Sequence, residues 1–312
     1  MNLTFEQIKS ITVGAVSIWQ ENDTVRFSKC TQKQVDAYYK LLPILGERAQ
    51  ATTGIRLDFY TDSSSFAFQA ASGSKFEIYV NGLLTNFIND NHCSIELDNS
   101  NGENRITLIL PSHENGSLLS VELDDNANLR VAEFDRKILF IGDSITQGWN
   151  SGYDSLSYAY RVSRNLNAHS VIQGIGRGFF DESILDDELD YDPDIIIVAF
   201  GTNDWGRDTL ENFAEKSGAF FDKILKKHCG KKIFAISPLW RGDKDSRRGG
   251  IDFDEHCLTV KKVASQRGII VIDGENMIPH LPEFFSDGYL HPNALGFSLY
   301  AENLTKFIQK YI

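Results

Sequence analysis

The chain has 312 residues, of which 42% are hydrophobic, and this is enough for two ordinary domains with separate cores. Its formal net charge of -12 disfavours nucleic acid and anionic membranes as partners, because both reward clustered lysine and arginine. No apolar run approaches the ~20 residues of a membrane-spanning helix, and residues 1–10 lack the basic-then-apolar pattern of a signal peptide. We therefore expect a soluble cytoplasmic protein. The sequence leaves its oligomeric state open.

The cysteine pattern agrees with that compartment. Cys30, Cys93, Cys229 and Cys257 are widely spaced and form no Cys-x-x-Cys pair. We interpret them as free thiols in a reducing environment, because disulfides persist mainly in secreted proteins.

Residues 1–132 are predicted to form an all-β domain. Apolar residues alternate with more polar ones in several short segments, as in half-buried strands; examples are Ile55-Leu57-Phe59, Phe76-Ile78-Val80 and Leu119-Val121-Leu123. Asn81-Gly82 predicts a tight hairpin, because a type I′ turn needs positive φ at both positions, and Asn101-Gly102 predicts a later turn. Many short strands separated by turns are typical of a jelly-roll β-sandwich. The exception is residues 32–42, a possible short helix before Pro43.

Residues 133–312 show a different pattern, in which apolar runs alternate with helix-period segments. Nearly continuous apolar runs are typical of parallel strands that are covered on both faces. Strands are predicted at residues 138–141, 170–173, 195–200, 233–237 and 269–272, and helices at residues 207–228, 253–267 and 293–311. We predict a doubly wound parallel sheet in a three-layer α/β/α domain of the flavodoxin-like kind.

Ser144 directly follows the first of these strands, in the segment Gly142-Asp143-Ser144. Ligands of open α/β sheets bind outside the carboxyl ends of the strands, so this hydroxyl is a candidate nucleophile. A helix after Ser144 would also present free N–H groups to a developing oxyanion. The alternative is that Ser144 only caps the helix, as serines often do.

Three glycines follow the second strand, at Gly174, Gly176 and Gly178. Their Gly-x-Gly-x-Gly spacing differs from the Gly-x-Gly-x-x-Gly of dinucleotide sites, so we do not interpret them as a nucleotide fingerprint. An exposed glycine N–H can donate to an oxyanion, and a flexible βα turn is the alternative.

Asn203 and His291 complete the candidate set. Asn203 follows the most apolar strand, in Gly201-Thr202-Asn203-Asp204, where its amide could point into the same site. His291 lies in a loop near Asp287 and is followed by a proline at a helix start. Histidine is the usual general base at neutral pH.

Taken together and in this order, these segments resemble the SGNH/GDSL hydrolase superfamily over residues 136–312. The resemblance implies that Ser144 is the nucleophile, that His291 is the base, and that the N–H of Ser144, the N–H of Gly176 and the amide of Asn203 form the oxyanion hole. Gly174 is the alternative to Gly176 as the glycine that matches the family motif. The order of the two domains is similar to that of carbohydrate esterases with an N-terminal jelly roll.

One spacing departs from the family pattern. The family places its acidic residue three positions before the histidine, but that position here is Gly288, and Asp287 lies four before His291. Either the loop bulges by one residue, so that Asp287 completes a triad, or a Ser–His dyad operates.

The resulting hypothesis is a serine esterase that acts on a small acyl ester, such as an acetylated sugar. Asp143, Trp205, Trp240 and Arg241 are candidate substrate-binding residues, with packing between loops as the alternative for the last three. No His-Glu-x-x-His, Cys/His cluster or phosphate-loop motif occurs, so the sequence implies neither a metal nor a cofactor. The alternatives are a thioesterase or lysophospholipase and, in another class, a catalytically silent carbohydrate-binding protein.

Overall fold

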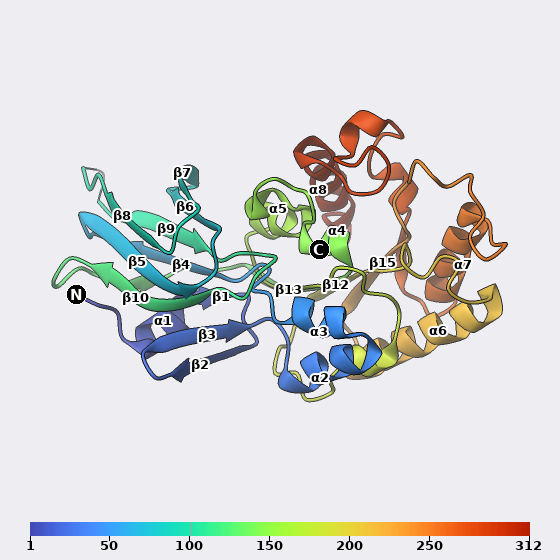
Figure 1. Cartoon of the computed structure of the whole chain (residues 1–312), viewed down its shortest axis with the longest axis horizontal. Coiled ribbons are helices and arrows are strands. Elements are labelled where there is room, and N and C mark those ends of the chain that lie inside the picture. The colour runs from blue at the N-terminus through green and yellow to red at the C-terminus, as the bar shows by residue number, and fades with distance from the viewer. Residues whose placement is uncertain (101) are drawn as a thin grey trace. The chain divides into compact units, whose positions relative to one another are not determined.

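The computed structural model describes residues 1–100 and 102–312, so Asn101 of the predicted Asn101-Gly102 turn lies outside the described residues. The chain divides into two compact units (Figure 1). The first contains Met1–Thr31 and Gln50–Phe134, and the second contains Gln32–Ala49 and Asp135–Ile312. This division differs from the predicted domains 1–132 and 133–312 mainly in one helical segment, Gln32–Ala49.

The first unit is a β-sandwich of two antiparallel sheets. One sheet has the order β1 (Thr12–Val13), β4 (Arg56–Thr61), β9 (Asn104–Ile109), β6 (Phe76–Val80), β7 (Leu83–Ile88), and β11 (Arg130–Val131) also pairs with β4. The other has the order β2 (Ser17–Glu21), β3 (Thr24–Ser28), β10 (Ser117–Leu123), β5 (Ser65–Ser72), β8 (His92–Glu96). Inward residues of both sheets, such as Leu57 and Phe59 of β4 and Phe66 and Phe68 of β5, share one core. Helix α1 (Phe5–Ile11) adds Ile8 and Ile11 to it.

The predicted hairpin at Asn81-Gly82 is confirmed. It joins β6 to β7, and the two residues have φ values of 53° and 81°. Positive φ at both positions is what a type I′ turn requires.

The second unit contains one parallel sheet, and all five predicted strands are confirmed. Its order is β13 (Ala168–Gly174), β12 (Arg136–Gly142), β14 (Ile195–Ala199), β15 (Lys232–Ile236), β16 (Ile270–Ile272). Numbered within this unit, the order is 2-1-3-4-5, the flavodoxin-like pattern of a doubly wound sheet.

Helices cover both faces of this sheet (Figure 1). They are α2 (Gln32–Leu41), α3 (Pro43–Ala49), α4 (Ser144–Gln147), α5 (Tyr158–Asn165), α6 (Leu210–Lys227), α7 (Phe253–Ser265) and α8 (Ala294–Ile308), with short 3-10 turns at Asp154–Leu156, Glu182–Ile184, Gly274–Asn276 and Pro282–Phe284. Phe140 of β12 meets Tyr158 of α5 edge-on, and Tyr158 stacks on Tyr300 of α8. Leu139 and Ile141, the chain neighbours of Phe140, line a small cavity together with Ile224 of α6. Successive residues of β12 therefore face opposite helical layers, as the period of a strand requires.

Helix α2 is attached to the parallel sheet by a pair of buried amides. Gln34 Nε2 donates to Gln173 Oε1 of β13 at 3.1 Å, and Gln173 Nε2 donates back to Gln34 Oε1 at 3.0 Å. Gln34 also donates to the carbonyl of Ile184 at 3.0 Å. Because buried polar groups are costly unless they are hydrogen-bonded, this pair explains why Gln32–Ala49 belongs to the second unit.

No helix in the part of the chain that the structure describes is both long and apolar enough to cross a membrane.

The amide pair gives a testable prediction. Gln34→Ala and Gln173→Ala should each lower the free energy of unfolding by about 1–3 kcal/mol, because each leaves the other amide without its partner. The double variant should cost less than the sum of the two, with a coupling of about 1 kcal/mol in urea unfolding. Additive losses would mean that the two amides stabilise the protein independently.

Candidate active site

The candidate site lies where the strand order of the parallel sheet reverses. The chain leaves β12 to form β13 on one side and later returns to form β14 on the other. Ser144 follows the carboxyl end of β12, and Asn203 follows that of β14. Crevices at such switch points bind the ligands of open α/β sheets, so both residues lie at the edge where a ligand is expected.

Close backbone packing fixes Ser144. A Cβ on Gly142 would lie 2.1 Å from Thr146 Oγ1 and 2.8 Å from the carbonyl oxygen of Ala199, so only glycine fits there. The carboxylate of Asp143 caps α4 by accepting the N–H of Ile145 at 2.9 Å. Asp143 is 3% exposed and serves as the cap of this helix, which favours a structural role over the predicted substrate contact. The N–H of Ser144 finds no acceptor within the described part of the chain.

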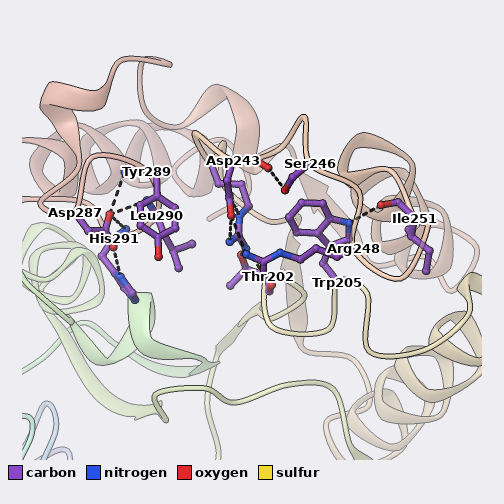
Figure 2. A network of polar contacts seen from close by, with 11 residues as sticks. Thr202, Trp205, Asp243, Ser246, Arg248, Ile251, Asp287, Tyr289, Leu290 and His291 are labelled. Carbon is purple, nitrogen blue, oxygen red and sulfur yellow. Dashed lines mark hydrogen bonds and ion pairs between the residues drawn. The ribbon is translucent and has the colours of Figure 1, made fainter.

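Ser144, His291 and Asp287 form a chain of hydrogen bonds. Ser144 Oγ lies 3.0 Å from His291 Nε2, and His291 Nδ1 lies 2.7 Å from Asp287 Oδ2. The other carboxylate oxygen, Oδ1, accepts the backbone N–H groups of Tyr289, Leu290 and His291 at 3.1, 2.8 and 3.0 Å (Figure 2). Gly288 has φ +77°. A left-handed glycine inside this turn accommodates the extra residue between the acid and the histidine.

Asp287 is held in its charged form. Partial burial acts to raise its pKa, but the hydrogen bonds from Leu290 N–H, the His291 ring and two further backbone N–H groups outweigh burial. The pKa of Asp287 therefore lies below its ordinary value. Because an ionised carboxylate only accepts hydrogen bonds, His291 Nδ1 carries the proton and Nε2 is free to accept the Ser144 hydroxyl.

The glycine loop after β13 differs from the prediction. The N–H of Gly176 already donates to Gln147 Oε1 at 2.8 Å, so it is not available to an oxyanion while that bond stands. Gly174 is the last residue of β13, paired with Gly142. The N–H of Arg177, the residue after Gly176, has no acceptor among residues 1–100 and 102–312. Arg177 is not a sequence-predicted donor, because glycine is the residue expected to expose its N–H in such a turn.

Asn203 faces the same loop. Its Nδ2 donates to the carbonyl of Gly178 at 3.0 Å. An amide nitrogen carries two hydrogens, so this bond orients the group and leaves the second hydrogen for a ligand.

Two further residues that were predicted to bind substrate are buried. Trp205 is 3% exposed and Arg241 is 2% exposed, which favours packing between loops, the alternative to substrate binding. Arg241 donates to Thr202 Oγ1 at 3.1 Å and forms an ion pair with Asp243. These long-range contacts cannot be seen in the sequence. Trp240 is half-buried and stacks on His280, with ring centroids 5.5 Å apart.

Arg241 also connects two of the candidate loops. Its bond to Thr202 holds the residue before Asn203, and the next residue along the chain, Gly242, donates its N–H to the carbonyl of Tyr289 at 2.8 Å. The segment at residues 241–243 therefore holds the Asn203 loop and the His291 loop together.

Two buried carboxyl groups lie beneath these loops. Burial raises the pKa of Asp143 to about 7, and burial together with the charge of Asp143 raises the pKa of Asp204 to about 7. Asp204 Oδ1 accepts the N–H of Phe180 at 3.1 Å, whereas Oδ2 has no hydrogen-bond partner in the described residues. Because charge there is costly, both groups favour the protonated form over much of the acidic range.

Metal ligands do not gather at the site. Among the described residues, no group of three or more His, Cys, Asp or Glu side chains could hold a metal ion.

Comparison with known proteins identifies the family. The GDSL-like Lipase/Acylhydrolase family model matches residues 140–299, which is over half of the chain and includes Ser144, Asn203 and His291. The chain belongs to this family and is a carboxylic ester hydrolase. No curated protein matches it in sequence.

Solved structures support the fold. The salicylyl-acyltransferase SsfX3 from a tetracycline biosynthetic pathway has a TM-score of 0.79 at 19% identity, covering 96% of this chain and 94% of that one. A family two carbohydrate esterase from Cellvibrio japonicus has a TM-score of 0.69 at 18% identity, covering 96% and 94%. Another from Clostridium thermocellum, in complex with cellohexaose, has a TM-score of 0.64 at 18% identity, covering 83% and 93%.

The buried carboxyls predict a pH dependence of stability. A raised folded-state pKa means that the folded protein binds protons that the unfolded chain has lost, so this contribution is greatest below pH ~4 and falls as the pH rises to about 7. Asp204→Asn keeps the shape of the side chain without its charge. It should therefore reduce this fall in the free energy of unfolding by about 2–4 kcal/mol between pH 4 and pH 8, as measured by urea unfolding.

The exposed carboxylate of Asp190 offers a matched control. Asp190→Asn should leave the pH profile unchanged. If Asp204→Asn instead follows the wild-type profile, Asp204 does not contribute to the pH dependence.

Proposed function

We propose that this protein is a serine esterase that hydrolyses a small acyl ester, such as an acetyl group on a carbohydrate. The observation that carries the proposal is the hydrogen-bonded chain from Ser144 through His291 to Asp287, with distances of 3.0 and 2.7 Å. A serine becomes an effective nucleophile when an adjacent, oriented base takes its proton. Membership of the acylhydrolase family supports the reaction class, and the likeness in fold to carbohydrate esterases supports the substrate class.

The chemistry follows the general scheme of serine hydrolases. Ser144 Oγ attacks the ester carbonyl while His291 Nε2 takes the hydroxyl proton, and the Asp287 carboxylate stabilises the imidazolium that forms. His291 then gives this proton to the leaving alcohol, which departs and leaves an acyl group on Ser144. A water molecule attacks the acyl-enzyme with His291 again as base, which releases the acid and restores the serine.

Three donors are proposed to hold the oxyanion. They are the backbone N–H of Ser144, the second amide hydrogen of Asn203 and, in place of Gly176, the backbone N–H of Arg177. Hydrogen-bond donors that are already oriented before the reaction stabilise the charge that develops in the transition state. Trp240, which is half-buried, remains a proposed substrate contact.

Ser144→Ala tests the proposal directly. We expect kcat for p-nitrophenyl acetate to fall by up to ~10⁶, as when a serine protease loses its nucleophile. Ser265→Ala removes an exposed hydroxyl on α7 and serves as the control, with unchanged rates expected. Retention of a tenth of the wild-type rate in Ser144→Ala would contradict the assignment. Esters of longer acyl chains and thioesters, assayed alongside, distinguish a deacetylase from a lysophospholipase or thioesterase.

Asp287→Asn distinguishes a triad from a dyad. The variant keeps Oδ1 as acceptor for the three backbone N–H groups, but its amide cannot accept from His291 Nδ1. The imidazole would then favour the wrong tautomer, which costs ~10⁴ in kcat where it has been measured in a triad. A loss of tenfold or less would favour the dyad. Circular dichroism of the same sample checks that the loop change has not unfolded the protein.

A further inference from the structure

The turn at residues 175–178 has an unusual residue at its strained position. The N–H of Gly178 donates to the carbonyl of Ile175 at 2.7 Å, and Arg177 at the third position has φ +68°. A turn of this kind strongly prefers glycine at that position, because a side chain there is strained. The other non-glycine residues with positive φ in the described chain are all asparagines, at positions 22, 81, 126, 150 and 167. Asparagine tolerates this region much better than arginine does.

Arg177 is also held close to the proposed catalytic groups. Gly176 on one side is bonded to Gln147 of α4, the helix that begins at Ser144. Gly178 on the other side is bonded to Asn203. The backbone of Arg177 is thus fixed from both sides, while its side chain is exposed and forms no ion pair or hydrogen bond within the described residues.

A second arginine lies beside it. A Cβ on Gly176 would lie 2.8 Å from Arg48 Nη1, so the missing side chain makes room for this guanidinium. Arg48 also lies over the ring of Trp149, 5.2 Å from its centroid. Partial burial and then the positive charge of Arg177 lower the pKa of Arg48, and Glu47 only partly offsets this. The two like charges therefore repel each other, although the chain as a whole carries a net charge of -12.

A strained backbone position and a pair of like charges both cost stability, and such costs concentrate at binding sites. We infer that Arg177 and Arg48 form an anion-recognising subsite, so that the preferred substrate of the esterase is an acyl ester whose alcohol part carries a carboxylate or a phosphate. Guanidinium groups recognise both anions through paired N–H donors. The inference rests on the proposed function, because it assigns the substrate of that same site.

Matched pairs of substrates test the subsite. Acetylated glucuronic acid and acetylated glucuronamide differ by one carboxylate, and acetylated glucose 6-phosphate and acetylated glucose differ by one phosphate. Acetate release should show a kcat/KM up to about fivefold higher for the charged member of at least one pair, which is the upper end for one exposed charge pair. The preference should shrink as the salt concentration rises. The pair with the larger preference identifies the anion.

Variants of Arg177 assign the preference. In Arg177→Asn and Arg177→Gly, which both suit positive φ, the charged-to-neutral ratio of kcat/KM should fall to near one. The ratio within one variant cancels any change in the chemical step that both substrates share. Arg177→Lys should keep part of the preference, since it keeps the charge without the planar fork.

Arg164 provides the control for net charge. It is exposed near the end of α5. The loop that follows α5 lies at the amino end of β12, opposite the candidate site, because the carbonyl of Asn167 accepts the N–H of Asp135 there. Arg164→Gln should leave both rates unchanged. A wild-type ratio near one in both pairs, or an unchanged ratio in Arg177→Asn, would overturn the inference. Failure to hydrolyse any acetyl ester, neutral ones included, would instead contradict the proposed function.

Discussion

The carboxylate of Asp287 fixes both the shape of the histidine loop and the orientation of the imidazole. One of its oxygens gathers three consecutive backbone N–H groups, and the other accepts the ring proton of His291. The loop is closed further by the N–H of Ser286, which donates to the carbonyl of His291 at 2.8 Å. The four hydrogen bonds that the carboxylate itself accepts favour its charged form, so the charge that orders the loop is also the charge that selects the histidine tautomer. Loop structure and proton transfer therefore depend on a single ionisation state.

The rest of the site depends on how closely its loops approach one another. Gly142 lies against Thr146 and Ala199, and a Cβ on Gly174 would lie 2.3 Å from the backbone nitrogen of Gln147. These glycines let α4 pack directly on β13, and this brings the Gln147 side chain to the N–H of Gly176. The loop after β13 then leaves the N–H of Arg177 as an open donor. The positions of the donors follow from backbone contacts, and a methyl group at either glycine would disturb them.

The sequence predicts those features that depend on local pattern. The five parallel strands, the Asn81-Gly82 hairpin and the family motifs are each visible in a few consecutive residues. Strand β2 is not predicted, because most of its residues are exposed and they show no clear alternation. Features that depend on distant contacts could not be predicted. The Gln34–Gln173 pair joins residues 139 positions apart, and the burial of Trp205 and Arg241 reflects partners on other loops. The bond between Gln147 and Gly176 also depends on a distant contact. For this reason the sequence favours Gly176 as the donor, whereas the open N–H in this turn is that of Arg177.

Charge at the site is arranged against the overall charge of the chain. An oxyanion that develops near Ser144 would be destabilised by ionised carboxylates below it, because Coulomb repulsion is strong where water is excluded. Burial opposes the ionisation of Asp143 and Asp204, whose pKa values are raised to about 7. Asp287 is the exception, and in the proposed mechanism its charge would be neutralised by the imidazolium that forms when His291 takes a proton. With Arg48 beside the Gly176 turn, the immediate surroundings of Ser144 are less negative than the net charge of -12 suggests. Desolvation of carboxyl groups below the site and cationic side chains beside it act in the same direction, and both favour negative charge on the reacting ester.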